Sequence, residues 1–241
     1  MRTVRVRGDE RVRRVRRQPR PALRASKVDR RRHPVSSPVR GTKQFTRALA
    51  KPHLRVIGLD DGPFLRSARR AALVGVIFSA PNYVEGILRT SVAIDGTDAT
   101  DRILTLLGRS PFLDGVRAVL LDGIAVGGFN LVDLDRLYEK LQRPIVTVTR
   151  RAPDFSAIHA ALRKYFPRDA PARWRLVRAH PLFRLATPEG NPLRVSAVGC
   201  TRAEASVIVR RTTVRGNIPE PLRLARLVAR ALVRSDTGKP A

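Results

Sequence analysis

The most informative stretch of the chain is Val116-Arg117-Ala118-Val119-Leu120-Leu121-Asp122-Gly123. Its apolar run is nearly continuous, which is typical of a parallel strand buried on both faces of a sheet. In open α/β sheets, ligands bind beyond the carboxyl ends of such strands. We therefore expect Asp122 to have a functional role. The Gly-rich continuation, 123–130, would let the backbone approach a ligand closely, with Gly123 the first residue in reach.

Two further strand-like runs also end in aspartate. The run 54–62 reads Leu-Arg-Val-Ile-Gly-Leu-Asp-Asp-Gly and delivers Asp60, and the run 87–96 delivers Asp95. Acidic residues are scarce, with 20 Asp and Glu against 48 Lys and Arg, so their recurrence at strand ends is not explained by solubility. Clustered carboxylates need a countercharge, and a divalent metal is the usual one. The sequence thus predicts a Mg²⁺ or Mn²⁺ site formed by Asp60, Asp95 and Asp122.

Each acidic residue also has a structural interpretation. Asp-Gly is a common turn pair, and we favour a turn for Asp61 while favouring a metal ligand for Asp60. Asp98 is equally consistent with a helix N-cap and with function. Glu85 is expected to face solvent.

The order of expected elements indicates the fold class. Three early strands read as an antiparallel meander, and alternating helices and strands follow. This order predicts an α/β fold, a mixed sheet with helices on both faces, as in the ribonuclease-H-like fold. The expected strands are 54–59, 72–79, 83–94, 116–121, 145–149, 173–185 and 193–198, and the expected helices are 97–107, 132–141, 155–165, 201–211 and 223–233.

The charge is concentrated at the N-terminus. Residues 1–50 hold 17 of the Lys and Arg and 3 of the Asp and Glu, and the net charge of the whole chain is +28. This segment is expected to be a basic disordered tail or a mis-assigned translation start, ahead of a domain over 51–235 and a disordered end at 236–241. So basic a chain predicts a polyanionic partner, above all nucleic acid, although solvated arginine is the alternative.

Composition also limits the class of protein. The single cysteine, Cys200, excludes an intramolecular disulfide, and no apolar run approaches the ~18 residues of a membrane span. No secretory signal is apparent, so a soluble, cytoplasmic protein without a membrane partner is expected. Oligomeric state is left open.

Two arginines follow the expected strand 145–149. Arg150 and Arg151 would lie on the same rim of the sheet as Asp122 and could contact a phosphate, and ordinary solvation is the alternative.

Four stretches together carry a family resemblance. They are Ile57-Gly-Leu-Asp-Asp-Gly-Pro-Phe64, Ile94-Asp-Gly-Thr-Asp-Ala-Thr100, Leu121-Asp-Gly-Ile-Ala-Val-Gly-Gly-Phe-Asn130 and Arg215-Gly-Asn-Ile-Pro-Glu-Pro-Leu-Arg-Leu-Ala225. From about Lys51 to Leu232 the chain resembles the largely archaeal, endonuclease-V-like family of unknown function (domain-of-unknown-function family ninety-nine). That family is similar to endonuclease V, a magnesium enzyme of ribonuclease-H-like fold that cuts strands near inosine.

The resemblance implies roles for single residues. Asp60 and Asp122-Gly123 match carboxylate positions of endonuclease V, Asp95 stands nearest to its glutamate, and Arg150 resembles its strand-end lysine. Tyr83 matches the tyrosine of its Tyr-x-x-Gly strand and would contact nucleic acid, as would Gly123, Arg150 and Arg151. Cys200 stands where endonuclease V has histidine.

Three functions are consistent with the sequence. The first is a metal-dependent endonuclease that cuts single-stranded or inosine-containing nucleic acid, with Asp60, Asp95, Asp122 and Arg150 as catalytic residues. The second is a non-catalytic nucleic-acid-binding protein on the same fold, motivated by Cys200. A nuclease-fold scaffold for a protein partner is a third possibility. The sequence does not distinguish DNA from RNA.

Overall fold

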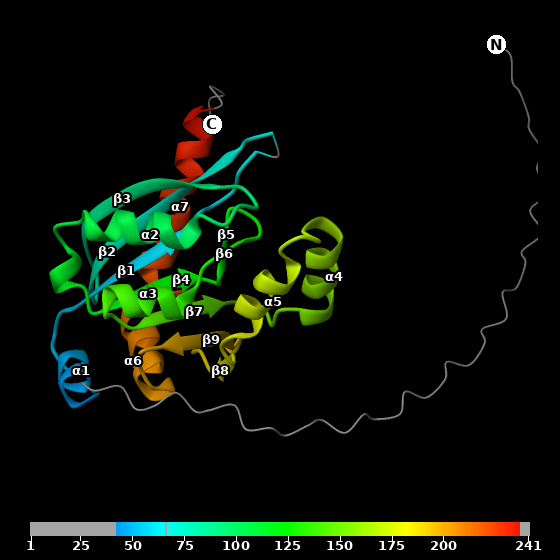
Figure 1. Ribbon diagram of the computed structural model, residues 1–241. Coiled ribbons are helices and arrows are strands. Elements are labelled where there is room, and N and C mark those ends of the chain that lie inside the picture. The colour runs from blue at the N-terminus through cyan, green and yellow to red at the C-terminus, as the bar shows by residue number, and fades with distance from the viewer. Residues whose placement is uncertain (1–41, 66, 237–241) are drawn as a thin grey trace, which may run out of the picture. The chain divides into compact units, whose positions relative to one another are not determined.

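The computed structural model describes residues 42–65 and 67–236, all within the second of two units, which starts at Pro38. In this part of the chain a seven-stranded mixed sheet has the order β3-β2-β1-β4-β7-β9-β8 (Figure 1). A two-stranded ribbon, β5-β6, stands apart from it. The strands are β1 (Leu54–Asp60), β2 (Arg70–Ala80), β3 (Tyr83–Ala93), β4 (Ala118–Asp122), β5 (Ala125–Val126), β6 (Asn130–Leu131), β7 (Ile145–Thr149), β8 (Phe183–Leu185) and β9 (Leu193–Val198).

Strand directions determine which residues share an edge of the sheet. Strands β1, β4 and β7 are parallel neighbours, whereas β2 is antiparallel to both β1 and β3. Strand β9 is antiparallel to β7 and to β8. The carboxyl ends of β1, β4 and β7 therefore meet at one edge. The expected antiparallel meander followed by parallel strands is confirmed.

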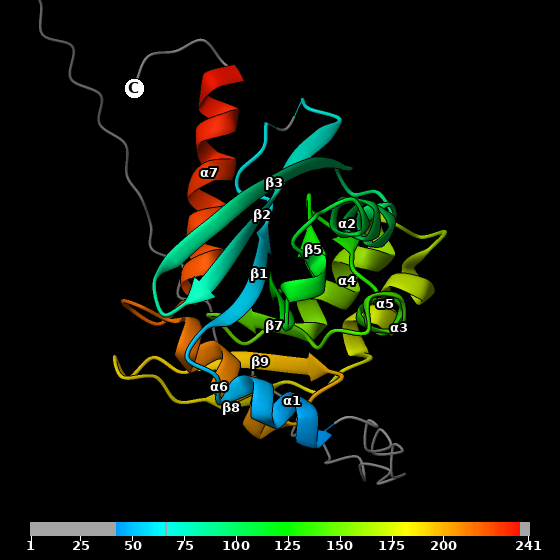
Figure 2. The same ribbon diagram turned by 90° about the vertical axis from the view of Figure 1, so that its left-hand side faces the viewer.

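Helices cover both faces of the sheet (Figure 2). On one face, α2 and α3 pack over a core that includes Ile57 and Leu59. On the other face, α6 and α7 pack over a core that includes Leu54 and Val56, because alternate residues of a strand point to opposite faces. The helices are α1 (Thr42–Leu49), α2 (Ala99–Gly108), the 3-10 turn η1 (Leu113–Gly115), α3 (Leu134–Leu141), α4 (Phe155–Tyr165), α5 (Ala170–Arg178), α6 (Arg202–Thr212) and α7 (Glu220–Asp236).

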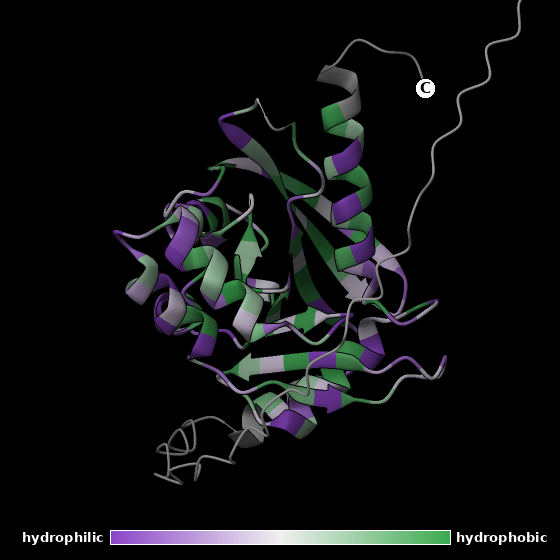
Figure 3. Ribbon diagram, turned by 90° about the vertical axis from the view of Figure 1, so that its right-hand side faces the viewer, coloured by the Kyte–Doolittle hydropathy of each residue, from purple (hydrophilic) through white to green (hydrophobic). Residues whose placement is uncertain are grey.

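Helix α7 lies unusually close to the sheet. A Cβ added to Gly58 in β1 would lie 2.6 Å from the carbonyl carbon of Pro221, so only glycine allows this approach. Further along, Ala225 and Ala229 pack against Val74 and Val76 of β2. Apolar and polar residues alternate along the helix in Figure 3, as an amphipathic helix requires. The buried small residues set which side chains of α7 reach the strand ends.

The structure corrects one residue expected on the inward face of α7. We expected Leu224, Leu227, Val228 and Leu232 to face inward, and Leu224, Val228 and Leu232 do pack against the core, but Leu227 is 46% exposed. The fully buried positions of this face include Leu222, Ala225 and Ala229.

Two other expectations are wrong. Residues 173–178 were expected in a strand but belong to α5, where Asp169 precedes the helix, Pro171 occupies its first turn and Arg173 pairs with Asp169 four residues earlier. Residues 42–49 were expected to be disordered but form α1, which packs through Leu49 against the core beside α6. The remaining expectations for residues 1–41 and 237–241 lie outside the described residues.

Among the helices of the described residues, none is long and apolar enough to cross a membrane.

Candidate active site

Asp60 and Asp122 end two adjacent parallel strands. The register pairs Leu59 of β1 with Leu121 of β4, so the next residue of each strand is an aspartate at the same level of the sheet. Asp60 is buried, at 3% exposure, and the side chain of Asp122 is 12% exposed. The strand pattern thus places two carboxylates side by side at the edge where a ligand is expected.

A cation from α7 joins these two carboxylates. The Nε of Arg226 donates to Asp60 Oδ2 at 2.8 Å, and its Nη2 donates to Asp122 Oδ2. Arg150 lies at the rim, with Nη1 4.0 Å from Asp122 Oδ2. The guanidinium of Arg226 satisfies two buried carboxylates at once, which is the planar, bidentate recognition to which arginine is suited.

Electrostatics at the pair favour a bound cation. Burial raises the pKa of Asp122, and the charge of Asp60 raises it further, while Arg226 and Arg150 oppose both effects. Two neighbouring carboxylates ionise together only when a positive charge compensates them. A cation is therefore part of this arrangement, and in this structure Arg226 supplies it.

Asp61 anchors the loop that follows β4. Its Oδ2 accepts a hydrogen bond of 2.6 Å from the Gly127 N–H, 66 residues along the chain. Burial raises the pKa of Asp61 to about 6, and the charge of Asp60 adds to this, while the Gly127 hydrogen bond lowers it. The residue expected in a simple turn thus connects two walls of the site.

The loop itself needs glycine where we expected it. Gly123 has φ +79° and Gly128 has φ +82°, values that other residues rarely adopt. The Gly123 N–H donates to the carbonyls of Leu121 and Val148, which turns the chain sharply after Asp122. This turn places Gly123 beside the carboxylate pair.

Asp95 is not brought to the pair. Asp60 aligns with Val74 of β2 and Val74 with Arg89 of β3, so Asp95 comes six residues beyond the level of Asp60. Within the described residues no hydrogen bond or ion pair joins it to Asp60 or Asp122. Instead its Oδ1 accepts from the Phe129 N–H at 2.7 Å. The geometry gives Asp95 a role in holding the 123–130 loop.

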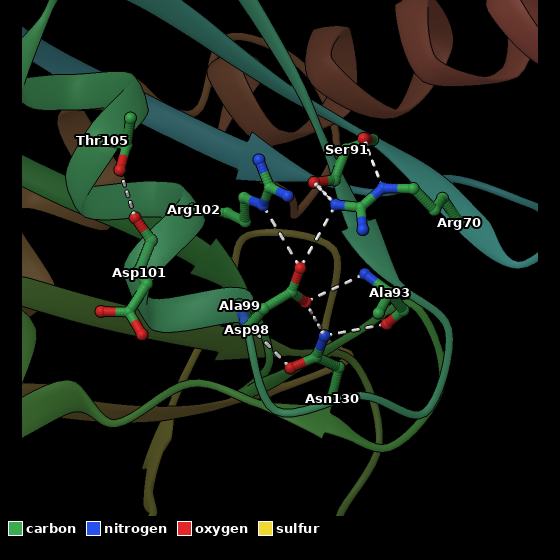
Figure 4. Close-up of polar contacts among 9 residues, drawn as sticks. All are labelled: Arg70, Ser91, Ala93, Asp98, Ala99, Asp101, Arg102, Thr105 and Asn130. Carbon is green, nitrogen blue, oxygen red and sulfur yellow. Dashed lines mark hydrogen bonds and ion pairs between the residues drawn. The ribbon is translucent and has the colours of Figure 1, made fainter.

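Asp98 is the centre of a structural network (Figure 4). It precedes α2 but makes no side-chain cap; Oδ1 accepts from the Ala93 N–H and from Asn130 Nδ2, and Oδ2 accepts from Arg70 and Arg102. Burial alone would raise the pKa of Asp98, but these hydrogen bonds outweigh it and lower the pKa. The network joins β3, α2 and β6. Asp98 thus occupies the N-cap position of α2 without a side-chain cap, and a functional role for it stays a prediction.

Two residues matched to endonuclease V lie at the opposite edge. Tyr83 pairs with Ser79, which pairs with Arg55 near the start of β1. Cys200 follows Val198, which pairs with the first residue of β7. Burial and the charge of Glu204 raise the pKa of the Cys200 thiol to about 12, so it stays protonated and is a poor metal ligand. Arg151 is exposed beside Arg150, and no ion pair to it is found among the described residues.

Sequence reasoning missed Arg226. The available signal was its spacing: it follows Leu222 by four residues and Ala225 by one, which places it at the border of the buried face of α7.

Comparisons with known proteins identify the family. The model of a family described as "Endonuclease dU" matches residues 52–233. The chain belongs to this family. A "UPF0215 protein" of Thermococcus gammatolerans is 42% identical over 194 residues, which cover 78% of this chain and 97% of that protein. The archaeal relatives of this chain and its similarity to endonuclease V structures confirm the resemblance to an archaeal, endonuclease-V-like family.

Two solved structures extend the comparison. The crystal structure of a protein of unknown function from Archaeoglobus fulgidus matches with a TM-score of 0.67 and 35% identity, covering 75% of this chain and 98% of that one. Endonuclease V of Ciona intestinalis, in complex with an inosine-containing DNA, matches with a TM-score of 0.52 and 16% identity, covering 76% and 87%. The latter match establishes the ribonuclease-H-like fold. Family membership and fold together support a nuclease-like role in nucleic-acid processing.

Proposed function

We propose that this protein is a metal-dependent endonuclease that cleaves a phosphodiester bond in single-stranded or deaminated nucleic acid. The observation that carries the proposal is the convergence of Asp60 and Asp122 at the ends of adjacent parallel strands. The family description favours deoxyuridine as the deaminated nucleoside, and the DNA bound by the Ciona enzyme contains inosine. Both are candidate substrates.

The residues at the pair fit a hard divalent ion such as Mg²⁺ or Mn²⁺. Carboxylate oxygens are the ligands that Mg²⁺ prefers, and Mg²⁺ is often bound by one or two carboxylates together with waters and substrate phosphates. No group of three or more His, Cys, Asp and Glu suited to a metal occurs in residues 42–65 and 67–236. We therefore propose Asp60 and Asp122 as the protein ligands, with water and substrate oxygens completing the coordination.

A bound ion would supply an activated water and stabilise the leaving oxygen. The chain would supply rigid placement, because Asp60 and Asp122 stand at the ends of buried strands. Arg150, at the rim and half-exposed, would bind a phosphate of the substrate. Arg226 would give up at least one carboxylate oxygen when the ion binds, and its guanidinium would then be free to hold the phosphate under attack.

Charge supports nucleic acid as the substrate. The chain carries a net charge of +28, and Arg150 and Arg151 lie on the rim that holds the carboxylates. Phosphate contacts from such side chains supply sequence-independent affinity that falls as salt rises.

One observation favours a non-catalytic nucleic-acid-binding protein instead. Arg226 bridges the buried pair and Arg150 lies at its rim, so two arginines balance the two carboxylates without a metal. The position of Cys200 no longer contributes to this alternative, because the residue lies at the opposite edge of the sheet.

A cleavage assay tests the proposal. Purified protein is incubated with end-labelled single strands that contain deoxyuridine, inosine or only ordinary bases, in Mg²⁺, Mn²⁺ or EDTA. We expect cleavage in metal that is lost in EDTA and in Asp122→Asn. Tight binding of every strand without cleavage, at protein in large excess and in either metal, would instead support the binding protein.

A further inference from the structure

A basic pocket lies at the edge of the sheet opposite to the carboxylates. It has a volume of about 190 Å³ and is lined by Lys51, His53, Arg55, Ser79, Gly115 and Arg117. Lys51 and His53 lead into β1, and Arg117 leads into the neighbouring β4. Asp60 lies five positions after Arg55 along β1, which is roughly 17 Å at ~3.3 Å per residue. The pocket is thus distinct from the candidate active site.

Two arginine side chains of adjacent strands lie next to each other in this pocket. The Arg117 N–H donates to the Arg55 carbonyl at 2.8 Å, so the two arginines are neighbours on adjacent strands. The Arg55 guanidinium lies against Gly115, where a Cβ would come within 1.9 Å of Nη1. Like charges at neighbouring strand positions are destabilising unless they are compensated.

Compensation by the protein is incomplete. Glu85 pairs with Arg55, at 2.6 Å from Nε, and its side chain is 14% exposed, so it does not face solvent as expected. In the part of the chain that the structure describes, no ion pair reaches Lys51, His53 or Arg117. One carboxylate therefore faces three side chains that are cationic at neutral pH, together with a histidine.

The pocket also offers a neutral hydrogen-bond donor. Ser79 pairs with Arg55 across β1 and β2, and it is only 8% exposed although it lines the pocket. A hydroxyl beside guanidinium and ammonium groups is the donor set that phosphate oxygens accept.

We propose that this pocket binds a phosphate group. The excess positive charge, the buried hydroxyl and the cavity together match a compact anion with several acceptor oxygens. The phosphate could belong to a nucleic-acid strand or to a small phosphorylated molecule. The proposal is independent of catalysis at Asp60 and Asp122.

Calorimetric titration with inorganic phosphate in EDTA tests the site in the full chain. Arg117→Gln and Lys51→Gln should each weaken phosphate binding at least fivefold. Arg210→Gln, which removes the same charge from an exposed position on α6, should change it less than twofold. Asp122→Asn should not change it, which separates this site from the proposed function. Equal loss in the Arg210→Gln control, or no loss in either pocket variant, would overturn the proposal.

Thermal melting shows whether the variants fold as the wild type does. Without phosphate, Arg117→Gln should melt no lower than the wild type, because it removes a repelling charge; with phosphate, the wild type should gain more in Tm than the variant.

A second titration uses an unphosphorylated oligothymidylate. Parallel weakening by Arg117→Gln, with competition from phosphate, would assign the phosphate to a nucleic-acid strand. Unchanged oligonucleotide binding would assign it to a small phosphorylated molecule.

Discussion

Arg226, the seventh residue of helix α7, donates a 2.8 Å hydrogen bond to Asp60, which stands 166 residues earlier at the end of strand β1. The same guanidinium reaches Asp122. It lies where we propose that a divalent ion binds both carboxylates. Arg226 and a metal ion should therefore compete for the same oxygens.

Replacing Arg226 should strengthen metal binding and weaken the metal-free fold. Arg226→Gln removes the competing cation, so we expect the Kd for Mn²⁺ to fall about tenfold, equivalent to ~1.4 kcal/mol. In EDTA the two carboxylates lose their partner, so the free energy of unfolding should fall by about 2 kcal/mol. This loss is smaller than for a fully buried pair because the side chain of Arg226 is 37% exposed. Calorimetry and urea unfolding measure the two effects.

Arg223→Gln is the matched control for this variant. Arg223 lies one turn earlier, is exposed, and pairs only with Glu220 on the same helix turn among the described residues. Its replacement should leave Mn²⁺ affinity unchanged. Unaltered or weaker Mn²⁺ binding in Arg226→Gln would show that the two cations do not compete.

Asp61 should make stability depend on pH. Its pKa is about 6 in the folded protein against 3.8 as the ordinary value, so the folded state holds the proton more tightly. The contribution of this residue to the free energy of unfolding is therefore greatest below pH 3.8, falls as the pH rises toward 6, and stays low above pH 6. The total decrease is at most ~3 kcal/mol. Asp61→Asn keeps an acceptor for Gly127 but removes the charge. In EDTA it should be more stable than the wild type at pH 8 and lose this advantage near pH 4; the same difference at both pH values would refute the assignment.

Asp98 should matter for folding and not for metal. Asp98→Ala removes acceptors for a backbone N–H, for Asn130 and for two arginines, and should cost about 2 kcal/mol of unfolding free energy. Mn²⁺ affinity of the folded variant should equal that of the wild type. Asp101→Ala, which removes an exposed pair with Arg136, should cost less than ~1 kcal/mol. Loss of Mn²⁺ binding in folded Asp98→Ala would give Asp98 a ligand role.

Replacing Asp95 and replacing Asp122 should have different effects on Mn²⁺ affinity. Asp95→Asn still offers an oxygen to the Phe129 N–H, so Mn²⁺ affinity should change less than threefold. Asp122→Asn removes a proposed ligand and should weaken Mn²⁺ at least tenfold. Equal losses in the two variants would restore Asp95 as a ligand, as the sequence suggested.

The carboxylate pair could be predicted because it depends on local signals. A buried apolar run followed by Asp-Gly defines both the end of β4 and the edge on which Asp122 lies, and parallel pairing brings the end of β1 beside it. The family resemblance pointed to the same two residues.

The other positions depend on lengths and directions that the sequence pattern does not contain. Strands β2 and β3 extend beyond the end of β1, so the residue level with Asp60 is Arg89 and Asp95 lies further on. Strand β9 runs antiparallel to β7, which takes Cys200 to the far edge. Arg226 was missed because the sequence pattern does not show that α7 packs against β1 and β4.

The proposed metal site can be observed in a crystal structure grown with Mn²⁺, through its anomalous difference map. We predict a peak roughly 2.0–2.3 Å from an oxygen of Asp60 and one of Asp122, with Arg226 displaced from at least one of them. A map without a peak at saturating Mn²⁺, with Arg226 still bridging both carboxylates, would contradict the metal site and favour the non-catalytic binding protein.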